Sequence, residues 1–394
     1  MKKVVSLMIS ADWHIGAIDP YRFKKELITL VKETLHEKKS LDLFIVAGDT
    51  FDMKEYLSSD SVKVFFLIMA ELLELTKEYN TEFRFIEGTR THDALQLSTL
   101  KVVFENLLMN KRVKFIEEVT KEEIHGLDIL YIPEEYIEDN EIYYKDYFNN
   151  HYDFIFGHGN TDLMWYMKDV KKTKGFSSPV FKSSELLQIA NYIYFGHFHY
   201  RMESKESDRF KSIGPVSRWE FGKEGDCGFY YTIYDNDSKL GIEDYIENIY
   251  APILTTTILN IKKSYELDEL DREIKRKING VKDNADKIRL IVNIDTSIEN
   301  YITMRDFILS AFRNIDNLTL IIKLIGEEES ESPENQLEDN NLSIEEKPYL
   351  YDKSMHDEAR IAAFIRKKEG VNISLESILD VITKKDTKIN AREE

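Results

Sequence analysis

Histidines and aspartates of this 394-residue chain gather in short segments that carry the side chains metal ions need. Five of the nine histidines lie in them. The segments are Asp12-Trp13-His14, Gly48-Asp49-Thr50-Phe51-Asp52, Gly88-Thr89-Arg90-Thr91-His92-Asp93, Gly157-His158-Gly159 and Gly196-His197-Phe198-His199. Mixed carboxylates and neutral imidazoles suit divalent metals such as Mn, Fe or Zn. The residue types therefore predict a metal centre.

Each of these segments directly follows a run of residues that predicts a β-strand. The strands are Val4–Ser10, Leu43–Ala47, Glu82–Glu87, Phe154–Phe156 and Tyr192–Phe195. Since the carboxyl ends of strands form the ligand-binding edge of an open α/β sheet, we expect the segments to meet in one cleft. The Asp-x-His and His-x-His spacings would place both side chains of a pair on one side of an extended segment. One such pair alone is common by chance, but the combination favours a metal site.

The wider pattern predicts an α/β fold. Amphipathic helices at Tyr21–Lys38 and Ser58–Tyr79 alternate with the first strands, which indicates a sheet with helices on both faces. Later strands at Leu127–Ile132, Ser212–Gly214 and Phe229–Tyr234 have little helix between them. This spacing indicates a second sheet and a sandwich of the two.

A change of pattern near Leu240–Tyr250 predicts a second, smaller domain. It would be a β-α-β-α-β unit with elements at Thr255–Ile261, Leu267–Lys277, Ile288–Ile294, Tyr301–Phe312 and Leu318–Ile325. A stretch rich in Glu, Ser and Asn follows, with the composition of a solvated linker, and then two short amphipathic helices. The predicted divisions are a large domain at 1–245, a small domain at 246–326, an acidic linker at 327–341 and a helical tail at 342–394.

Composition and charge limit the classes of function. The 42% hydrophobic and 32% charged residues exclude wholesale disorder. No apolar stretch approaches the roughly 18–20 residues of a membrane helix, so we expect no membrane contact, and the single Cys227 indicates a cytoplasmic protein without an internal disulfide. The net charge is −19, so the chain lacks the basic footprint of a protein that binds nucleic acid by itself.

The motif set resembles that of the calcineurin-like metallophosphoesterases. The matching motifs are Asp12-x-His14, Gly48-Asp49-x-x-Asp52, His92-Asp93, Gly157-His158 and Gly196-His197-x-His199. Within that superfamily the chain is most similar to the SbcD-type nuclease subunit of SbcC–SbcD DNA repair complexes. The segment from Ser212 to Arg218 and the small β/α unit also match. Over residues 1–325, the resemblance implies a two-sheet α/β sandwich with a small β/α capping domain, followed by C-terminal helices.

The resemblance further implies two divalent metal ions. Mn²⁺ is the expected ion, and Mg²⁺ is the alternative. By motif, the ligands would be Asp12, His14 and His199 for one ion, His158 and His197 for the other, and Asp49 bridging both. Such a metal pair can polarise a phosphodiester and activate water for in-line attack.

Other site residues follow from the same resemblance. His92 would donate a proton to the leaving oxygen, and Asp93 would either orient His92 or cap the following helix. Arg218 is a candidate DNA contact. The family usually has Asn, a second-metal ligand, before the histidine. Here Thr91 occupies that place, a poorer ligand, while Arg90 could contact a phosphate or be a solvent-exposed loop charge.

Three functions of different classes remain open. The first is a metal-dependent DNA nuclease (exonuclease or endonuclease) that acts in DNA repair or recombination with an SbcC-type SMC-like ATPase and forms a homodimer of the nuclease subunit. The second is a phosphatase or small phosphodiesterase, which the acidic charge would suit. The third is a non-catalytic scaffold, suggested by the altered third motif. The small domain and the amphipathic tail favour the first, provided that the ATPase supplies the DNA affinity.

Overall fold

The computed structural model describes residues 3–107, 110–135, 140–163, 180–221, 225–283 and 285–325. The helices within them are α1 (Pro20–Lys38), α2 (Asp60–Leu75), α3 (Leu97–Lys101), α4 (Asn140–Phe148), α5 (Ser183–Leu186), α6 (Leu267–Lys282) and α7 (Tyr301–Phe312), with a 3-10 turn at Lys77–Tyr79 and a π-helical turn at Val102–Leu107. None of these described helices is long and apolar enough to cross a membrane. The predicted linker 327–341 and tail 342–394 lie outside the described residues.

The strands form two large sheets, one smaller sheet and a short pair. Their bounds are β1 (Val4–Ser10), β2 (Leu43–Ala47), β3 (Glu82–Ile86), β4 (Val113–Ile116), β5 (Thr120–Ile124), β6 (Leu127–Ile132), β7 (Tyr152–His158), β8 (Asn160–Thr161), β9 (Val180–Phe181), β10 (Ala190–Gly196), β11 (Met202–Glu203), β12 (Phe210–Ser212), β13 (Gly228–Asp235), β14 (Leu240–Glu247), β15 (Leu254–Ile261), β16 (Lys287–Asp295) and β17 (Leu318–Ile325). The first sheet, in the described part of the chain, has the order β14-β13-β1-β2-β3-β4, and the second has β11-β12-β10-β7-β6-β5. The predicted α/β class is confirmed.

The two large sheets share a buried core because their strands are apolar on both faces. Leu7 and Ile9 of β1 lie in one cluster with Phe154 and Phe156 of β7, so the inner faces of the sheets pack against each other. Met8, between them in sequence, belongs to a different cluster on the outer face. Side chains alternate between the faces of a strand, so a strand buried on both faces is continuously apolar.

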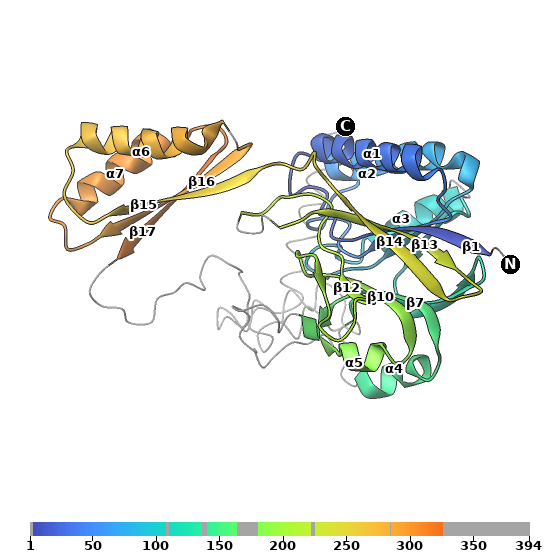
Figure 1. Ribbon diagram of the computed structural model, residues 1–394. Helices are drawn as coiled ribbons and strands as arrows, with labels where there is room; N and C mark the ends of the chain where they lie inside the picture. The colour runs from blue at the N-terminus through green and yellow to red at the C-terminus, as the bar shows by residue number, and fades with distance from the viewer. Residues whose placement is uncertain are drawn as a thin grey trace, which may run out of the picture. The chain divides into compact units, whose positions relative to one another are not determined.

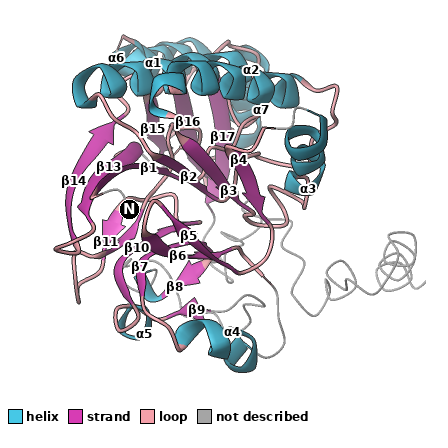
Figure 2. Cartoon of the chain, turned by 90° about the vertical axis from the view of Figure 1, so that its right-hand side faces the viewer, coloured by secondary structure: helices cyan, strands magenta, loops and turns pink. Residues whose placement is uncertain are grey.

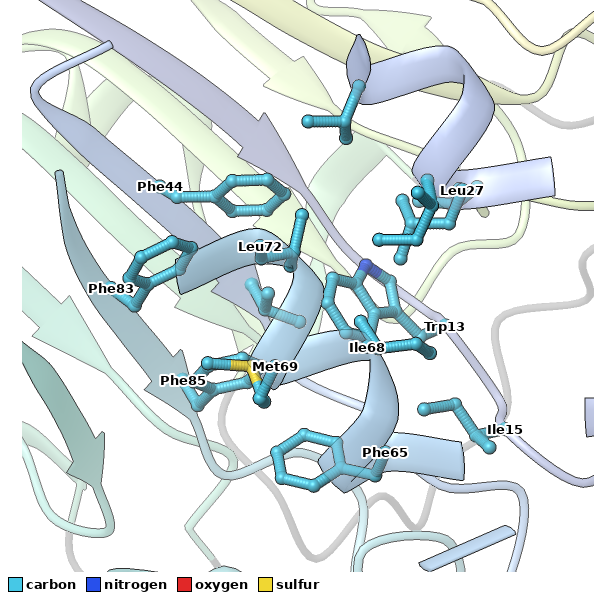
Figure 3. Close-up of a cluster of buried hydrophobic side chains, with 14 of the residues drawn as sticks. Trp13, Ile15, Leu27, Phe44, Phe65, Ile68, Met69, Leu72, Phe83 and Phe85 are labelled. Atoms are coloured by element: carbon cyan, nitrogen blue, oxygen red, sulfur yellow. The ribbon is translucent and has the colours of Figure 1, made fainter. Parts of the chain in front are cut away.

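Helices cover the outer face of each large sheet (Figure 2). Helices α1 and α2 lie side by side on the outer face of the first sheet (Figures 1 and 2). Their apolar stripes, including Leu27, Phe65 and Ile68, pack on Phe44 and the neighbouring strand residues (Figure 3). On the second sheet, α4 and α5 contribute Tyr144 and Leu186 to a separate cluster.

Capping side chains define where the two long helices begin. Asp19 accepts a hydrogen bond of 2.7 Å from the Arg22 N–H, and Ser59 accepts one of 3.2 Å from the Val62 N–H. These side chains satisfy amide donors that the first helical turn leaves without a partner. Both helices therefore start close to their predicted positions.

Two predicted features of the sandwich are wrong. The sequence predicts helices on both faces of the first sheet, but its inner face is covered by the second sheet. The strand predicted at Phe229–Tyr234 was assigned to the second sheet, but β13 pairs antiparallel with β1 in the first. Antiparallel neighbours need no crossover helix. A scarcity of helix near a strand therefore does not indicate which sheet contains it.

A buried guanidinium links the two large sheets. The Arg84 side chain of β3 is fully buried, and its Nε donates a hydrogen bond of 2.7 Å to Glu122 of β5. We expect Arg84→Met to lower the free energy of unfolding by about 3–5 kcal/mol, because the Glu122 carboxylate would lose a buried partner. Lys114→Met removes a half-exposed partner of the same carboxylate and should cost below about 1 kcal/mol. Urea denaturation would measure both, and equal losses would contradict this assignment.

The small sheet has a core of its own. Strands β15, β16 and β17 are parallel neighbours, and α6 and α7 connect them as the predicted β-α-β-α-β unit. Ile274 of α6 and Ile308 of α7 pack on Leu290 and Val292 of β16. Burial alternates along β16, which indicates that one face of this sheet is covered. The predicted boundary at 245/246 stays a prediction.

Candidate metal centre

The loops after β1 and β2 are joined by main-chain hydrogen bonds. The N–H groups of Asp12 and His14 donate to the carbonyls of Gly48 and Asp49 at 3.1 and 3.0 Å. Asp12, His14 and Asp49 have φ values of 50°, 44° and 49°, and His197 has 89°. Left-handed conformations cost non-glycine residues roughly 1–3 kcal/mol each and are typical of functional sites. The Asp-x-His segment is therefore an irregular loop with two left-handed residues and not the extended segment predicted.

This loop brings a first group of donor atoms together. Asp12, His14, Asp49 and His199 each offer an atom within 4.8 Å of the others. The Nε2 atoms of His14 and His199 are 3.0 Å apart. Two ligands about 2.1 Å from one ion and at right angles would be roughly 3.0 Å apart, so this separation suits a shared metal.

The Asp12 carboxylate supports a cation at this position. Its Oδ1 accepts a hydrogen bond of 2.9 Å from the His197 N–H, while its Oδ2 is buried without a hydrogen-bond partner. A buried carboxylate oxygen costs free energy unless a donor or a cation satisfies it. The Asp12 side chain therefore fits a metal ligand.

A second group consists of Asp49, His158 and His197, whose donor atoms also lie within 4.8 Å of one another. His158 Nδ1 donates to the Ala47 carbonyl at 2.8 Å, so its Nε2 is the nitrogen directed at Asp49 Oδ2, 3.2 Å away. Gly48 is required here, because its φ is 83° and a Cβ would approach His158 Nδ1 to 2.0 Å. The six predicted metal ligands thus lie in two groups that share Asp49.

Two further residues, which the sequence did not single out, lie at the second group. Thr89 donates its N–H to Asp49 Oδ1 at 2.6 Å, and its Oγ1 is 3.3 Å from both His158 Nε2 and His197 Nδ1. Glu134, buried just after β6, accepts a hydrogen bond of 2.9 Å from Thr89 Oγ1. Thr91, the residue predicted for this position, is exposed. The extra loop residues therefore put Thr89 in its place.

His92 lies beside the first group, where it was predicted. Its ring is 4.6 Å from that of His14 in an edge-to-face arrangement. Its Nδ1 hydrogen bonds to the Asp52 carbonyl. Because a carbonyl only accepts, Nδ1 carries the proton and Nε2 is the atom that can exchange one. Asp52 also places Oδ1 3.4 Å from His14 Nδ1, the position of an orienting carboxylate.

Asp93 connects two loops. It accepts hydrogen bonds of 3.0 and 2.9 Å from the N–H groups of Phe51 and Gly88, with one oxygen for each. Both of its oxygens thus bind backbone instead of the His92 ring, so the predicted orienting role is replaced by a loop-joining one. Gly88 is needed because a Cβ there would lie 2.2 Å from the Asp49 N.

The remaining predicted site residues have ordinary surroundings. Arg90 is half-buried in the loop after β3. The Arg218 side chain is 17% exposed and donates to the Gly225 carbonyl at 3.2 Å, with Glu247 at 3.7 Å. Trp219, next to it, was not predicted. The centroid of its ring lies 4.4 Å from that of the His14 ring and 4.7 Å from that of the His199 ring. Only its position one residue after the Ser212–Arg218 segment could have indicated it.

Charges in the centre shift several pKa values. Burial alone would lower the pKa of His158, but the carboxylates of Asp49, Asp12 and Glu134 outweigh burial and raise it to about 10. Burial would likewise raise the pKa of Glu134, but His197 and His158 lower it to about 2. Burial, with the charge of Asp49, raises the pKa of Asp93 to about 7. Without metal, protonated imidazoles supply the positive charge that the carboxylates require.

The melting temperature of the metal-free protein should therefore fall in alkaline solution. The pKa of His158 is raised from 6.5 to about 10, so its stabilising charge is complete below about pH 6.5 and is lost as the pH rises through about 10. Thermal denaturation in EDTA between about pH 6.5 and about pH 9.5 would measure the fall. His158→Gln keeps a donor for the Ala47 carbonyl and should flatten the dependence; an unchanged slope would contradict this cause.

The sequence matches no protein-family model and no curated protein. One solved structure that it resembles has 10% sequence identity, with 62% of this chain covering 99% of the other. The TM-score of that match is 0.34, which is too low to support an argument about fold or function.

Proposed function

We propose that this chain is a metal-dependent phosphodiesterase that uses two divalent metal ions, and specifically a DNA nuclease of the calcineurin-like metallophosphoesterase type. One observation carries the proposal: two groups of donor atoms share Asp49 at the carboxyl edge of two packed sheets. Paired metal sites with a shared carboxylate are typical of phosphoester hydrolysis. The mixed donors suit Mn²⁺, with Mg²⁺ as the alternative.

Each residue has a separate task in this proposal. Bound Mn²⁺ ions would polarise the phosphodiester and make water a nucleophile at neutral pH. His158 is fixed by its hydrogen bond to the Ala47 carbonyl, and Asp52 lies 3.4 Å from His14 Nδ1, so both imidazoles present Nε2 to the centre. His92 is held through Nδ1 and exchanges a proton with the leaving oxygen at Nε2.

The test compares substrates with one preparation of the full-length protein. With Mn²⁺ added, we expect cleavage of linear duplex or single-stranded DNA and of bis-p-nitrophenyl phosphate, and loss of both activities in EDTA. Faster hydrolysis of p-nitrophenyl phosphate than of any diester would instead support the phosphatase alternative, which the net charge of −19 favours. Absence of any Mn²⁺-dependent hydrolysis would instead support the third alternative, a non-catalytic scaffold.

A partner would explain how so acidic a chain acts on DNA. We propose an SMC-like coiled-coil ATPase of the SbcC type, which would supply the basic surface, with the nuclease subunit as a homodimer. The tail at 342–394 carries Phe364, Ile365, Leu375 and Ile378 at helical spacing, the pattern of a helix that binds in a groove.

Removing residues 342–394 should then leave Mn²⁺-dependent cleavage of short substrates unchanged and abolish co-purification with the ATPase. Pull-down from co-expressing cells would measure binding, and thermal denaturation would measure stability. A lower melting temperature with an intact complex would instead assign these residues to the small domain.

A further inference from the structure

The side chain of Glu134 occupies a position at the second donor group that no motif predicts. We propose that Glu134 is a metal ligand there, giving the second ion a carboxylate of its own beside the shared Asp49. This inference rests on the proposed function, because it assumes that the centre binds two ions. It assigns to the segment after β6 a part in metal binding.

The distances around Glu134 fit this role. Its Oε2 is 3.3 Å from His197 Nδ1 and 3.8 Å from His158 Nε2. Ligands about 2.1 Å from one ion are roughly 3.0 Å apart at right angles and roughly 3.4 Å apart at tetrahedral angles. The 3.3 Å separation and the 3.2 Å between Asp49 Oδ2 and His158 Nε2 fall in this range, and the 3.8 Å separation is slightly longer. One ion among these atoms would therefore meet Glu134 without a large movement of the histidines.

Thr89 marks the space between these groups. Its Oγ1 lies 2.9 Å from Glu134 Oε2 and 3.3 Å from Asp49 Oδ2, His158 Nε2 and His197 Nδ1. With a metal bound both imidazoles would be neutral, so all four atoms would present lone pairs, and a hydroxyl with one proton could satisfy only one of them at a time. The other donor atoms converge on a point that one Thr hydroxyl cannot satisfy. A divalent cation could satisfy them together.

Burial and backbone contacts hold Glu134 at the centre. Its side chain is only 2% exposed, and its N–H donates to the Glu87 carbonyl at 3.3 Å, which ties the segment after β6 to the end of β3. Asp49 and Glu134 both carry negative charge, and a cation would remove the repulsion between them. The donor atoms of Asp49, His158 and His197 are the tighter group, so binding would draw Glu134 inward.

The added carboxylate changes what the second position prefers. Two carboxylates and two imidazoles form a harder donor set than one carboxylate with imidazoles, and carboxylate oxygen suits Mn²⁺ and Mg²⁺. The additional negative charge of Glu134 would also offset one of the positive charges of the two metal ions. The Glu134 carboxylate thus provides the oxygen donor that the neutral Thr89 hydroxyl alone would supply poorly.

The experiment is Mn²⁺ titration of the metal-free, full-length protein by calorimetry, with Mn²⁺ electron paramagnetic resonance as a second count. Wild type should bind two ions per chain. Glu134→Gln, which keeps the side-chain length, should bind one ion, or the second more than about 100-fold weaker, since residues that merely orient a ligand cost about 10–100-fold. Glu135→Gln, at a neighbouring buried carboxylate beside Tyr143, is the matched control and should bind two.

The outcomes separate the two proposals. Two ions in Glu134→Gln, with the second weakened by less than about 100-fold, would overturn the role of Glu134 while leaving the phosphodiesterase intact. A wild type that binds no Mn²⁺ would overturn the proposed function itself. If Glu134→Gln does not fold, Glu134→His replaces one ligand by another and should retain two ions, with a changed Co²⁺ absorption spectrum; an unchanged spectrum would contradict the inference.

Discussion

Asp49→Asn should lower the Mn²⁺-dependent hydrolysis rate by about 10³–10⁵-fold, the largest effect we expect from any single substitution. Asp49 Oδ2 lies 3.2 Å from His158 Nε2 and 3.7 Å from His14 Nε2, so the same carboxylate faces both donor groups. An amide has one oxygen and no charge and cannot replace a shared carboxylate. Metal ions contribute several kcal/mol to such reactions, and each 1.36 kcal/mol is tenfold in rate.

Steady-state rates and the Mn²⁺ stoichiometry of the same preparation would test this. The matched control is Asp153→Asn, because Asp153 is a buried carboxylate at the amino end of β7, the strand whose carboxyl end carries His158. Its Oδ1 accepts a hydrogen bond of 2.7 Å from the Tyr234 hydroxyl, so the control should lower stability and leave the rate unchanged. Two tightly bound Mn²⁺ ions in Asp49→Asn would refute a shared ligand.

The sequence could predict that these side chains gather at one place, because they come directly after strands. Val4–Ser10 and Leu43–Ala47 are apolar on both faces, so their limits are clear, and each ends where Asp12 or Asp49 follows. Parallel pairing of β1 with β2, and of β7 with β10, then brings the carboxyl ends together. The order of the strands within each sheet did not have to be predicted for these side chains to be expected at the same edge.

The sequence could not predict which side chains complete the second donor group. The motif position suggested Thr91, but the backbone conformation of the loop after β3 puts Thr89 against Asp49 and leaves Thr91 exposed. Glu134 lies 45 positions from Thr89 in the sequence and follows a strand with no motif. The pairing of β6 with β7, which carries His158, and the hydrogen bond from the Glu134 N–H to the Glu87 carbonyl bring it near. A contact of this kind depends on tertiary structure and not on local spacing.

The placement of β13 shows the same limit at the level of the fold. Its apolar residues correctly predicted a strand, but its partner depends on which sheet edge is free. β13 pairs with β1 and extends the first sheet, and Tyr230 and Tyr234 then enter the core between the sheets. Short-range patterns determine where strands lie, whereas packing of whole sheets determines their neighbours.

His92→Gln should lower the rate of DNA cleavage by about 10²–10⁴-fold, the usual contribution of a general acid, and leave two Mn²⁺ ions bound. His92 Nδ1 is committed to the Asp52 carbonyl, so only Nε2 can pass a proton to a leaving oxygen. The Gln side chain has no group that can donate a proton to a leaving oxygen at neutral pH. His36→Gln, at an exposed histidine in the last turn of α1, is the control and should leave the rate unchanged.

The leaving group decides whether His92 acts by proton transfer. A nitrophenolate departs without protonation. The rate of hydrolysis of a p-nitrophenyl ester of thymidine phosphate should therefore fall much less in His92→Gln than the rate of DNA cleavage. Equal losses on both substrates would mean that His92 acts on the centre in some other way, for instance by packing against His14, whose ring is 4.6 Å away. Loss of a bound Mn²⁺ ion would instead make His92 a ligand, since its donor atoms also group with those of His14 and Asp52. Retained metal with a loss confined to the poor leaving group is the pattern that proton donation from Nε2 requires.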